Sequence, residues 1–254
     1  MTEPSDHPVT RAAIREAADL VNMLLGSLER PVSVVVDGTS QVVFRRQSAI
    51  ELSVAKSGRM VSGLGGAIAL ADAGYLTESA CILRVASDLF LEVMSTTEGA
   101  LKGTPTRDQQ EFVNQFFGRP VAAPAPGDPR RSYQSRAVIF KAMDRLVGGV
   151  TEDRAEFRRM KDQLDYSLDA YVHGTYATCM ALYDPLTGRF MLDGVRSERD
   201  RAEMRGYVAA ITHQVLIAIG MTALAMNLPR VNERVGVALA RLADSHEERY
   251  SRDS

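Results

Sequence analysis

The chain has 254 residues, a formal net charge of −2 and a hydrophobic fraction of 45%. This length is enough for one large domain or two small ones, and the nearly neutral charge gives no overall attraction to nucleic acid or to an anionic membrane. Tryptophan is absent and aromatic residues make up only 6%, which favours helices over sheets. The two cysteines, Cys81 and Cys179, have no C-x-x-C spacing, which favours a reducing cytoplasm over a disulfide framework.

The sequence of the N-terminal part predicts a tail, one helix and a β-rich segment with two possible conformations. Residues 1–9 lack the basic start and the apolar run of a signal peptide, and we expect them to form a disordered tail. Apolar residues recur at helical spacing from Thr10 to about Arg30, which predicts the first helix. The runs VSVVV and QVVF then flank Asp37-Gly38, so that residues 33–44 form either a small hairpin or an extended strap.

Helical periodicity continues through most of the remaining chain. Segment 48–73 carries GLGG at 63–66, where each glycine costs about 1 kcal/mol relative to alanine and indicates close helix packing. Thr77 is expected to cap the next helix, and T-x-x-Q at 106–109 is a capping box for a short helix. Residues 118–131 are rich in Pro and Gly and predict a surface loop. Further helices are expected at 78–98, 133–147, 152–173, 199–227 and 232–249, with residues 176–183 resuming the helix that ends at His173.

The stretch Tyr207–Leu228 has no formally charged residue and is long enough to span a bilayer. Its His213 and Gln214 and its many alanines favour instead a central helix of a soluble bundle, with His213 satisfied in the core. We therefore predict that residues 10–249 form a single all-α bundle of about seven or eight helices, without membrane insertion. Segments 48–73, 78–98 and 199–227 are expected to form its core.

Two helices carry charged residues on one face. In segment 78–98, Arg84, Asp88 and Glu92 share a stripe on an otherwise apolar helix, either as an ion pair at the edge of the core or as a polar cluster facing a cleft. In segment 152–173, Asp165 and Asp169 share a face with His173, a spacing that suits a metal site. Because the opposite face is apolar, we expect a solvated face for the aspartates and no bound metal or cofactor.

His173 lies where its helix breaks, followed by Gly174 and near Tyr171. A helix break leaves backbone groups open to hydrogen bonding, so this histidine is a candidate general base. The alternative is that it holds the kink together. No hydrolase, NTPase or zinc signature occurs elsewhere in the chain.

Three stretches resemble a group of uncharacterised bacterial helical proteins distantly similar to the HEPN superfamily: RMVSGLGGAIALADAGYLTESA with CILRVASDLFLEV, LDAYVHGTYATCMALY, and GRFML. The resemblance implies a helical bundle that forms a homodimer. It also implies a candidate metal-independent ribonuclease motif, R-x4–6-H, in which His moves protons and Arg stabilises charge. Arg241 and His246 have this spacing, with Leu242 where the active motif usually has a polar residue.

Three functions therefore stay open. The first is a non-catalytic binding or accessory protein, in stress or phage defence, with a protein or RNA partner. The second is a HEPN-like ribonuclease that uses Arg241 and His246 or a cleft of Arg84, Asp88, Glu92 and His173. The third is a metal-dependent hydrolase built on the carboxylates of the two charged faces together with His173.

Overall fold

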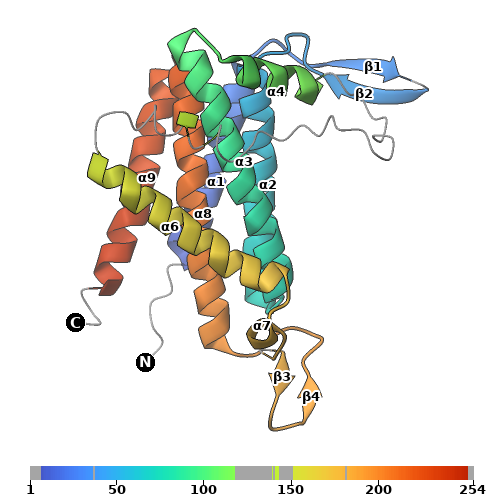
Figure 1. The fold of residues 1–254 in the computed structure, drawn as a ribbon, viewed down its shortest axis with the longest axis vertical. Coiled ribbons are helices and arrows are strands. Elements are labelled where there is room, and N and C mark those ends of the chain that lie inside the picture. Colours follow the sequence, from blue (N-terminus) through green and yellow to red (C-terminus); the bar gives the residue numbers. More distant parts are fainter. Residues whose placement is uncertain are drawn as a thin grey trace.

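The computed structural model describes residues 7–36, 38–117, 139, 141–142, 151–180 and 182–250. Within them the predicted all-α bundle with a small hairpin is confirmed (Figure 1). The elements are, in chain order, α1 (His7–Gly26), β1 (Val32–Val36), β2 (Thr39–Val43), α2 (Ala49–Ala73), α3 (Leu76–Lys102), α4 (Arg107–Phe117), α6 (Thr151–Val172), α7 (Tyr176–Met180), β3 (Tyr183–Asp184), β4 (Arg189–Phe190), α8 (Glu198–Ala225) and α9 (Pro229–Tyr250).

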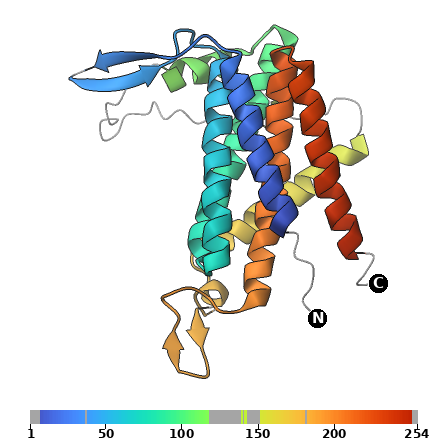
Figure 2. The ribbon, with the colours of Figure 1, turned by 180° about the vertical axis from the view of Figure 1, so that it is seen from behind.

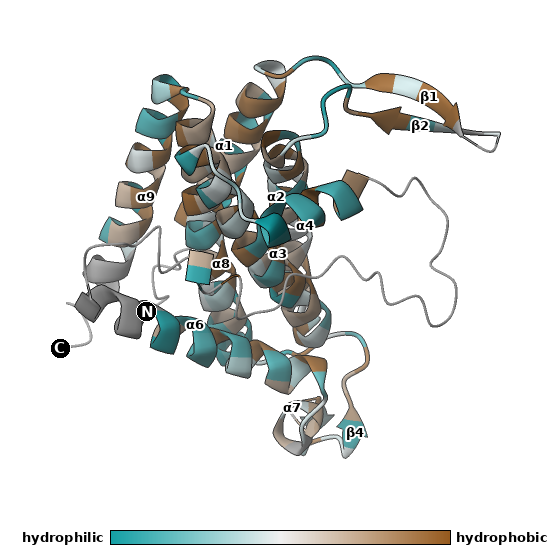
Figure 3. Ribbon diagram, turned by 45° about the horizontal axis from the view of Figure 1, so that its top comes forward, coloured by the Kyte–Doolittle hydropathy of each residue, from teal (hydrophilic) through white to brown (hydrophobic). Residues whose placement is uncertain are grey.

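Five long helices, α1, α2, α3, α8 and α9, run side by side along the long axis of the molecule, and α6 crosses them (Figures 1 and 2). α8 contacts the other four long helices and carries a ladder of fully buried residues, Met204, Val208, Ile211, Val215 and Ile219. Figure 3 shows the contrast with α6, whose residues are mainly hydrophilic. The core therefore lies around α8, as the uncharged stretch predicts.

α8 is the one described helix that is long and apolar enough to cross a membrane, and 67% of its most apolar window is buried inside the bundle. Its buried hydroxyls bond within the helix, with Thr212 donating to the carbonyl of Val208 at 2.7 Å and Thr222 to that of Ala218 at 2.8 Å. The prediction for His213 is wrong, because this side chain is exposed rather than in the core. The apolar face of α8 is therefore used for packing, and its histidine is on the surface.

Side-chain caps set several helix starts. Ser48 and Glu51 form a reciprocal capping box at α2, and Ser197 accepts a hydrogen bond from the Asp200 amide at α8. The T-x-x-Q box is also present, since the Thr106 amide donates to Gln109 Oε1 at 2.8 Å. The prediction for Thr77 is wrong, because α3 already begins at Leu76, directly after the turn at Gly74.

The segment 33–44 is a hairpin, with β1 and β2 antiparallel in a register that pairs Val36 with Thr39. The helix predicted at 176–183 is present but shorter, because α7 ends at Met180 and a second hairpin follows, in which Tyr183 pairs with Phe190 across β3 and β4. The turn explains the difference. Leu186 N–H donates to Asp184 Oδ1 at 2.9 Å, and Gly188 supplies a left-handed φ of 68°.

Some predictions fall on residues outside the described part. The loop at 118–131 lies there entirely, and of the helix at 133–147 only residues 139, 141 and 142 are described, all helical. Of the expected tail at 1–9, residues 7–9 belong to the first turn of α1.

The glycines of α2 differ in their surroundings. A Cβ on Gly63 would lie 3.1 Å from Ile82 Cγ2, which confirms close packing of α2 on α3 at this position, whereas Gly65 has nothing within 4 Å. Gly74 ends α2 with a φ of 86°, and its Cβ would lie 2.4 Å from the carbonyl oxygen of Val195. Among the glycines from Gly58 to Gly74, only Gly63 and Gly74 stand where an added Cβ would lie closer than 3.4 Å to a neighbouring atom.

Gly65→Ala should raise the free energy of unfolding by up to about 1 kcal/mol, because it removes backbone entropy from the unfolded chain without a clash. Gly74→Ala should lower it by at least about 2 kcal/mol, because it adds strain at positive φ and a backbone collision. Chemical denaturation of both variants measures the two changes. Equal changes in the free energy of unfolding for Gly65→Ala and Gly74→Ala would contradict the different surroundings of the two glycines.

Candidate functional site

The stripe on α3 meets the charged face of α6. Arg84 Nε donates to Asp169 Oδ1 at 2.8 Å, and the same guanidinium forms an ion pair with Asp88 one turn further along α3. Burial alone would lower the pKa of Arg84, but the hydrogen bond to Asp88 and the charges of Asp165 and Asp169 outweigh it and raise that pKa. Arg84 therefore remains a cation that joins α3 to α6.

A second, deeper contact joins the same two helices. Ser87 Oγ donates to Asp165 Oδ1 at 3.0 Å, and the buried Lys161 ammonium bonds Asp165 Oδ2 at 2.5 Å. The prediction of a solvated face is therefore wrong for Asp165, which is buried, although Asp169 stays partly exposed. Burial lowers the pKa of Lys161, and the bond to Asp165 opposes that shift.

These contacts define the α3–α6 network: Arg84, Ser87, Asp88, Lys161, Asp165 and Asp169. Each cation in it has a carboxylate partner, so the charges largely cancel. An arrangement of this kind holds two helices in register. Its two more exposed carboxylates, Asp88 and Asp169, both already pair with Arg84, and its other cation, Lys161, is buried against Asp165.

Glu92 does not belong to this network. Its carboxylate pairs with Lys56 of α2, and the two side chains are only 11% and 10% exposed. The Lys56 ammonium also lies 4.7 Å from the centre of the Phe112 ring and 5.2 Å from that of Phe116. The single cleft proposed for Arg84, Asp88, Glu92 and His173 therefore divides, with Glu92 inside the contact of α2, α3 and α4.

Around Glu92 lies a buried polar band that sequence reasoning missed. Ser53 lies 3.2 Å from the hydroxyls of both Thr96 and Thr97, and Gln109 Nε2 donates to the Ser95 carbonyl at 2.6 Å and to Glu98 Oε2 at 2.8 Å. Every residue from Phe90 to Gly99 is buried. Polar residues on all sides of a helix usually indicate solvent, so the sequence pattern conceals this burial.

His173 is exposed just beyond the end of α6. Its imidazole has no hydrogen bond or ion pair with another described residue, while its amide donates to the Asp169 carbonyl at 2.9 Å. Gly174, at a φ of 60°, turns the chain there. The helix break is thus held by backbone bonds, and the imidazole has no described partner that would tune it as a general base.

The remaining candidates lie elsewhere. Arg241 is exposed on α9 while Leu242 packs in the core, and the side chain of His246 lies outside the described part, so the R-x4-H motif stays a prediction. Among the described residues no three His, Cys, Asp or Glu side chains gather as metal ligands. The oxygens of Asp165 and Asp169 contact cations and Ser87 instead.

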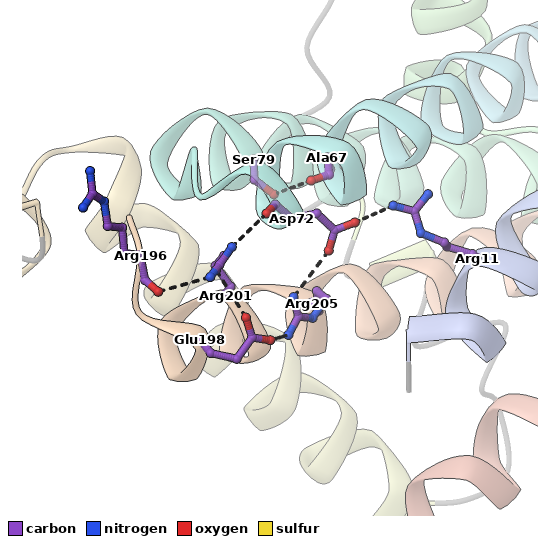
Figure 4. A network of polar contacts seen from close by, with 8 residues as sticks. All are labelled: Arg11, Ala67, Asp72, Ser79, Arg196, Glu198, Arg201 and Arg205. Atoms are coloured by element: carbon purple, nitrogen blue, oxygen red, sulfur yellow. Dashed lines mark hydrogen bonds and ion pairs between the residues drawn. The ribbon is translucent and has the colours of Figure 1, made fainter. Parts of the chain in front are cut away.

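A third cluster, also missed from the sequence, joins α1, α2 and α8 at Asp72 (Figure 4). Its carboxylate forms ion pairs with Arg11 and, at 3.4 Å, with Arg205, and its carbonyl accepts from Arg201 at 3.3 Å. Glu198 bonds both α8 arginines, and the hydrogen bond from Arg205 holds the pKa of Glu198 below its usual range. Residues far apart in the chain are joined here, so spacing alone gives no sign of the cluster.

Comparison with known proteins adds no family. The chain matches no protein-family model, no curated protein and no solved structure. The resemblance to HEPN proteins therefore stays a prediction.

Removal of either partner of the Lys56–Glu92 pair should lower the free energy of unfolding by roughly 3–5 kcal/mol, because the other charge is left buried and unpaired. Lys56→Met and Glu92→Leu together should recover most of that loss. Denaturant titration of the two single variants and the double variant measures the coupling. If the double variant loses as much free energy of unfolding as the two single variants added together, Lys56 and Glu92 do not form a direct buried pair.

Burial raises the pKa of Tyr171 to about 12 from an ordinary value of 10.0. The neutral phenol therefore stabilises the fold fully below pH 10, and this contribution is lost as the pH rises from 10 through about 12. Tyr171→Phe should flatten the fall in thermal midpoint over that range. If the thermal midpoint of the variant falls as steeply with pH as that of the wild type, groups other than Tyr171 cause the alkaline loss of stability.

Proposed function

We propose that the protein is a non-catalytic binding module of the cytoplasm that engages a protein partner through its β3–β4 hairpin. The observation that carries this proposal is the distribution of exposed apolar side chains. Half of the large hydrophobic residues that the described part leaves exposed lie between α6 and the start of α8: Met160, Tyr166, Val172, Tyr183, Leu186, Phe190 and Leu192.

Four of these residues form what we call the hairpin tip, Tyr183, Leu186, Phe190 and Leu192. Leu186 is 94% exposed and Leu192 is 81% exposed. The Tyr183 and Phe190 rings meet edge to face, with centroids 5.8 Å apart. A close group of exposed aromatic and aliphatic side chains is typical of a protein-binding surface, where such residues serve as anchors in a partner's pockets.

The tip is also held in shape before binding. Asp184 accepts from the Leu186 amide and, at 2.8 Å, from the Thr187 hydroxyl, and these bonds hold the pKa of Asp184 below its ordinary value. The hairpin projects beyond the end of the bundle (Figure 1). A preformed turn reduces the entropy lost on binding, which favours recognition by the tip.

The charged residues near the tip favour a protein partner over nucleic acid or an anionic membrane. Arg189 and Arg196 near the tip are accompanied by Asp184 and by Asp193, which pairs with Arg196 at 3.7 Å. Basic residues without acidic neighbours are the usual mark of nucleic-acid or anionic-lipid surfaces. The mixed charges therefore support a protein with an apolar pocket as the partner. We propose that this partner acts in stress or phage defence.

The charged clusters support a role without catalysis. In the α3–α6 network and at Asp72, each arginine and the lysine already bonds a carboxylate, on its own helix for Lys161 and on a neighbouring helix for Arg84 and Arg205. A ribonuclease would need a cation and a histidine beside a bound phosphate. In the described part no such pair is assembled around His173.

Leu186→Ser with Leu192→Ser should weaken partner binding at least ten-fold, because both apolar anchors are lost from the tip. Val35→Ser with Val42→Ser is the matched control, since these valines are 73% and 75% exposed on the other hairpin. The full chain and both double variants would be used for affinity purification. A partner held by the wild type and the control would then be purified and titrated against all three proteins by calorimetry.

Two outcomes would overturn the proposal. Equal affinity of the tip variant and the wild type for the purified partner would remove the hairpin as the binding surface. Cleavage of single-stranded RNA by the pure protein that survives EDTA and is lost in His246→Ala would replace the binding module with the ribonuclease. His173→Ala in the same assay would show whether that histidine takes part.

A further inference from the structure

A shallow groove lies on the outer face of the α2–α3 hairpin. It measures about 190 Å³, with Ile82, Val85, Ala86 and Leu89 of α3 on one side and Arg59 and Gly63 of α2 on the other. Val85 is exposed and Ile82 and Leu89 are half-buried, so the floor and rim are apolar. This face is separate from the core side of the two helices, which packs on α8.

The size of the groove limits its occupant. Sites for drug-sized molecules and cofactors usually measure about 300–1,000 Å³ and enclose most of the ligand. This depression is smaller and open, which suits one or two side chains from another helix. Apart from Arg59, the residues that α2 exposes alongside it are small, Ser62, Gly65 and Ala69, so a second helix can approach the α2 backbone closely.

Charge is arranged unequally along the groove. Arg59 lies at the end near Leu89, while Glu78 lies one turn beyond Cys81 on the same stripe of α3, at the other end. Both side chains are exposed, and neither has an ion pair with another described residue. A surface with a cation at one end and an anion at the other is complementary to its own copy turned by 180°.

We infer that two copies of this chain associate through the α2–α3 groove around a two-fold axis near Val85. The α2–α3 hairpins then run antiparallel, the Val85 side chains meet at the centre, and Arg59 of each copy lies beside Glu78 of the other. Glu78 is seven residues from Val85, or about 10 Å along the helix, a separation that an arginine placed on the opposite side of the axis can reach. This inference is independent of the function proposed for the hairpin tip.

The first test is the size of the full chain by sedimentation over a range of concentrations. The wild type should be a dimer, and Val85→Arg should raise the dissociation constant at least ten-fold. Val237→Arg is the matched control, since Val237 on α9 is 48% exposed against 51% for Val85, and it should remain a dimer. A monomeric wild type, or equal effects of the two arginines, would overturn the inference.

Charge reversal tests the orientation. Arg59→Glu and Glu78→Arg should each weaken the dimer, because each places like charges together across the axis. The double reversal should restore wild-type association, since it exchanges the two signs. Failure of the double variant to recover, while both single variants stay folded by circular dichroism, would exclude the antiparallel arrangement.

The two exposed free cysteines provide an internal comparison. Cys81 lines the groove, whereas Cys179 lies on α7 and is not among the residues that line it. Maleimide labelling of Cys81 should slow as protein concentration rises through the dimer range, and labelling of Cys179 should not. Equal concentration dependence at the two sites, or none at either, would place the interface elsewhere or exclude it.

Discussion

The burial of α8 is the constraint on which the rest of the bundle depends. A helix with a long uncharged stretch cannot leave that surface in water, and each fully buried Val, Leu or Ile contributes roughly 1.5–3 kcal/mol by its removal from solvent. Four helices are needed to cover it, because α8 is apolar on most of its sides rather than along one stripe. The α2–α3 hairpin, α1 and α9 are arranged accordingly, and the two small hairpins project from this frame without contributing to its core (Figures 1 and 2).

Polar residues inside such a frame determine which helix lies beside which. The Lys56–Glu92 pair, the α3–α6 network and the Asp72 cluster each join different helices, and each cation has a carboxylate partner. Buried pairs add little net stability compared with apolar residues of the same size, but a sliding or rotated helix would leave their charges unpaired. Their contribution is therefore to the register of α2, α3, α6 and α8. A charged cluster that serves this purpose resembles a catalytic site in sequence, because both bring acids and bases to one helix face.

Local signals predicted the elements well, and long-range pairing was the part that could not be predicted. The T-x-x-Q box from Thr106 to Gln109 marks a helix start within a single turn of sequence, and α4 begins there. Helical spacing correctly placed Arg84 and Asp88 together. It could not show that Glu92, one turn further, pairs with Lys56, because a helical wheel gives the face of a residue and not its neighbour. Arg205 and Asp72 are 133 positions apart, and no spacing rule connects them.

The surfaces left after this internal pairing are the places where a function can lie. Charges that are satisfied inside the bundle are poor candidates for binding, since a ligand would have to replace partners that are already well placed. Exposed apolar residues have no such competition. Four of them lie at the β3–β4 tip, and Val85 is exposed in the α2–α3 groove between the half-buried Ile82 and Leu89. The two surfaces involve different elements, so occupation of one does not cover the other. A dimer formed through the groove would carry two tips, and a partner with two binding sites would then be held more tightly than a single tip allows, without any additional contact in either interface.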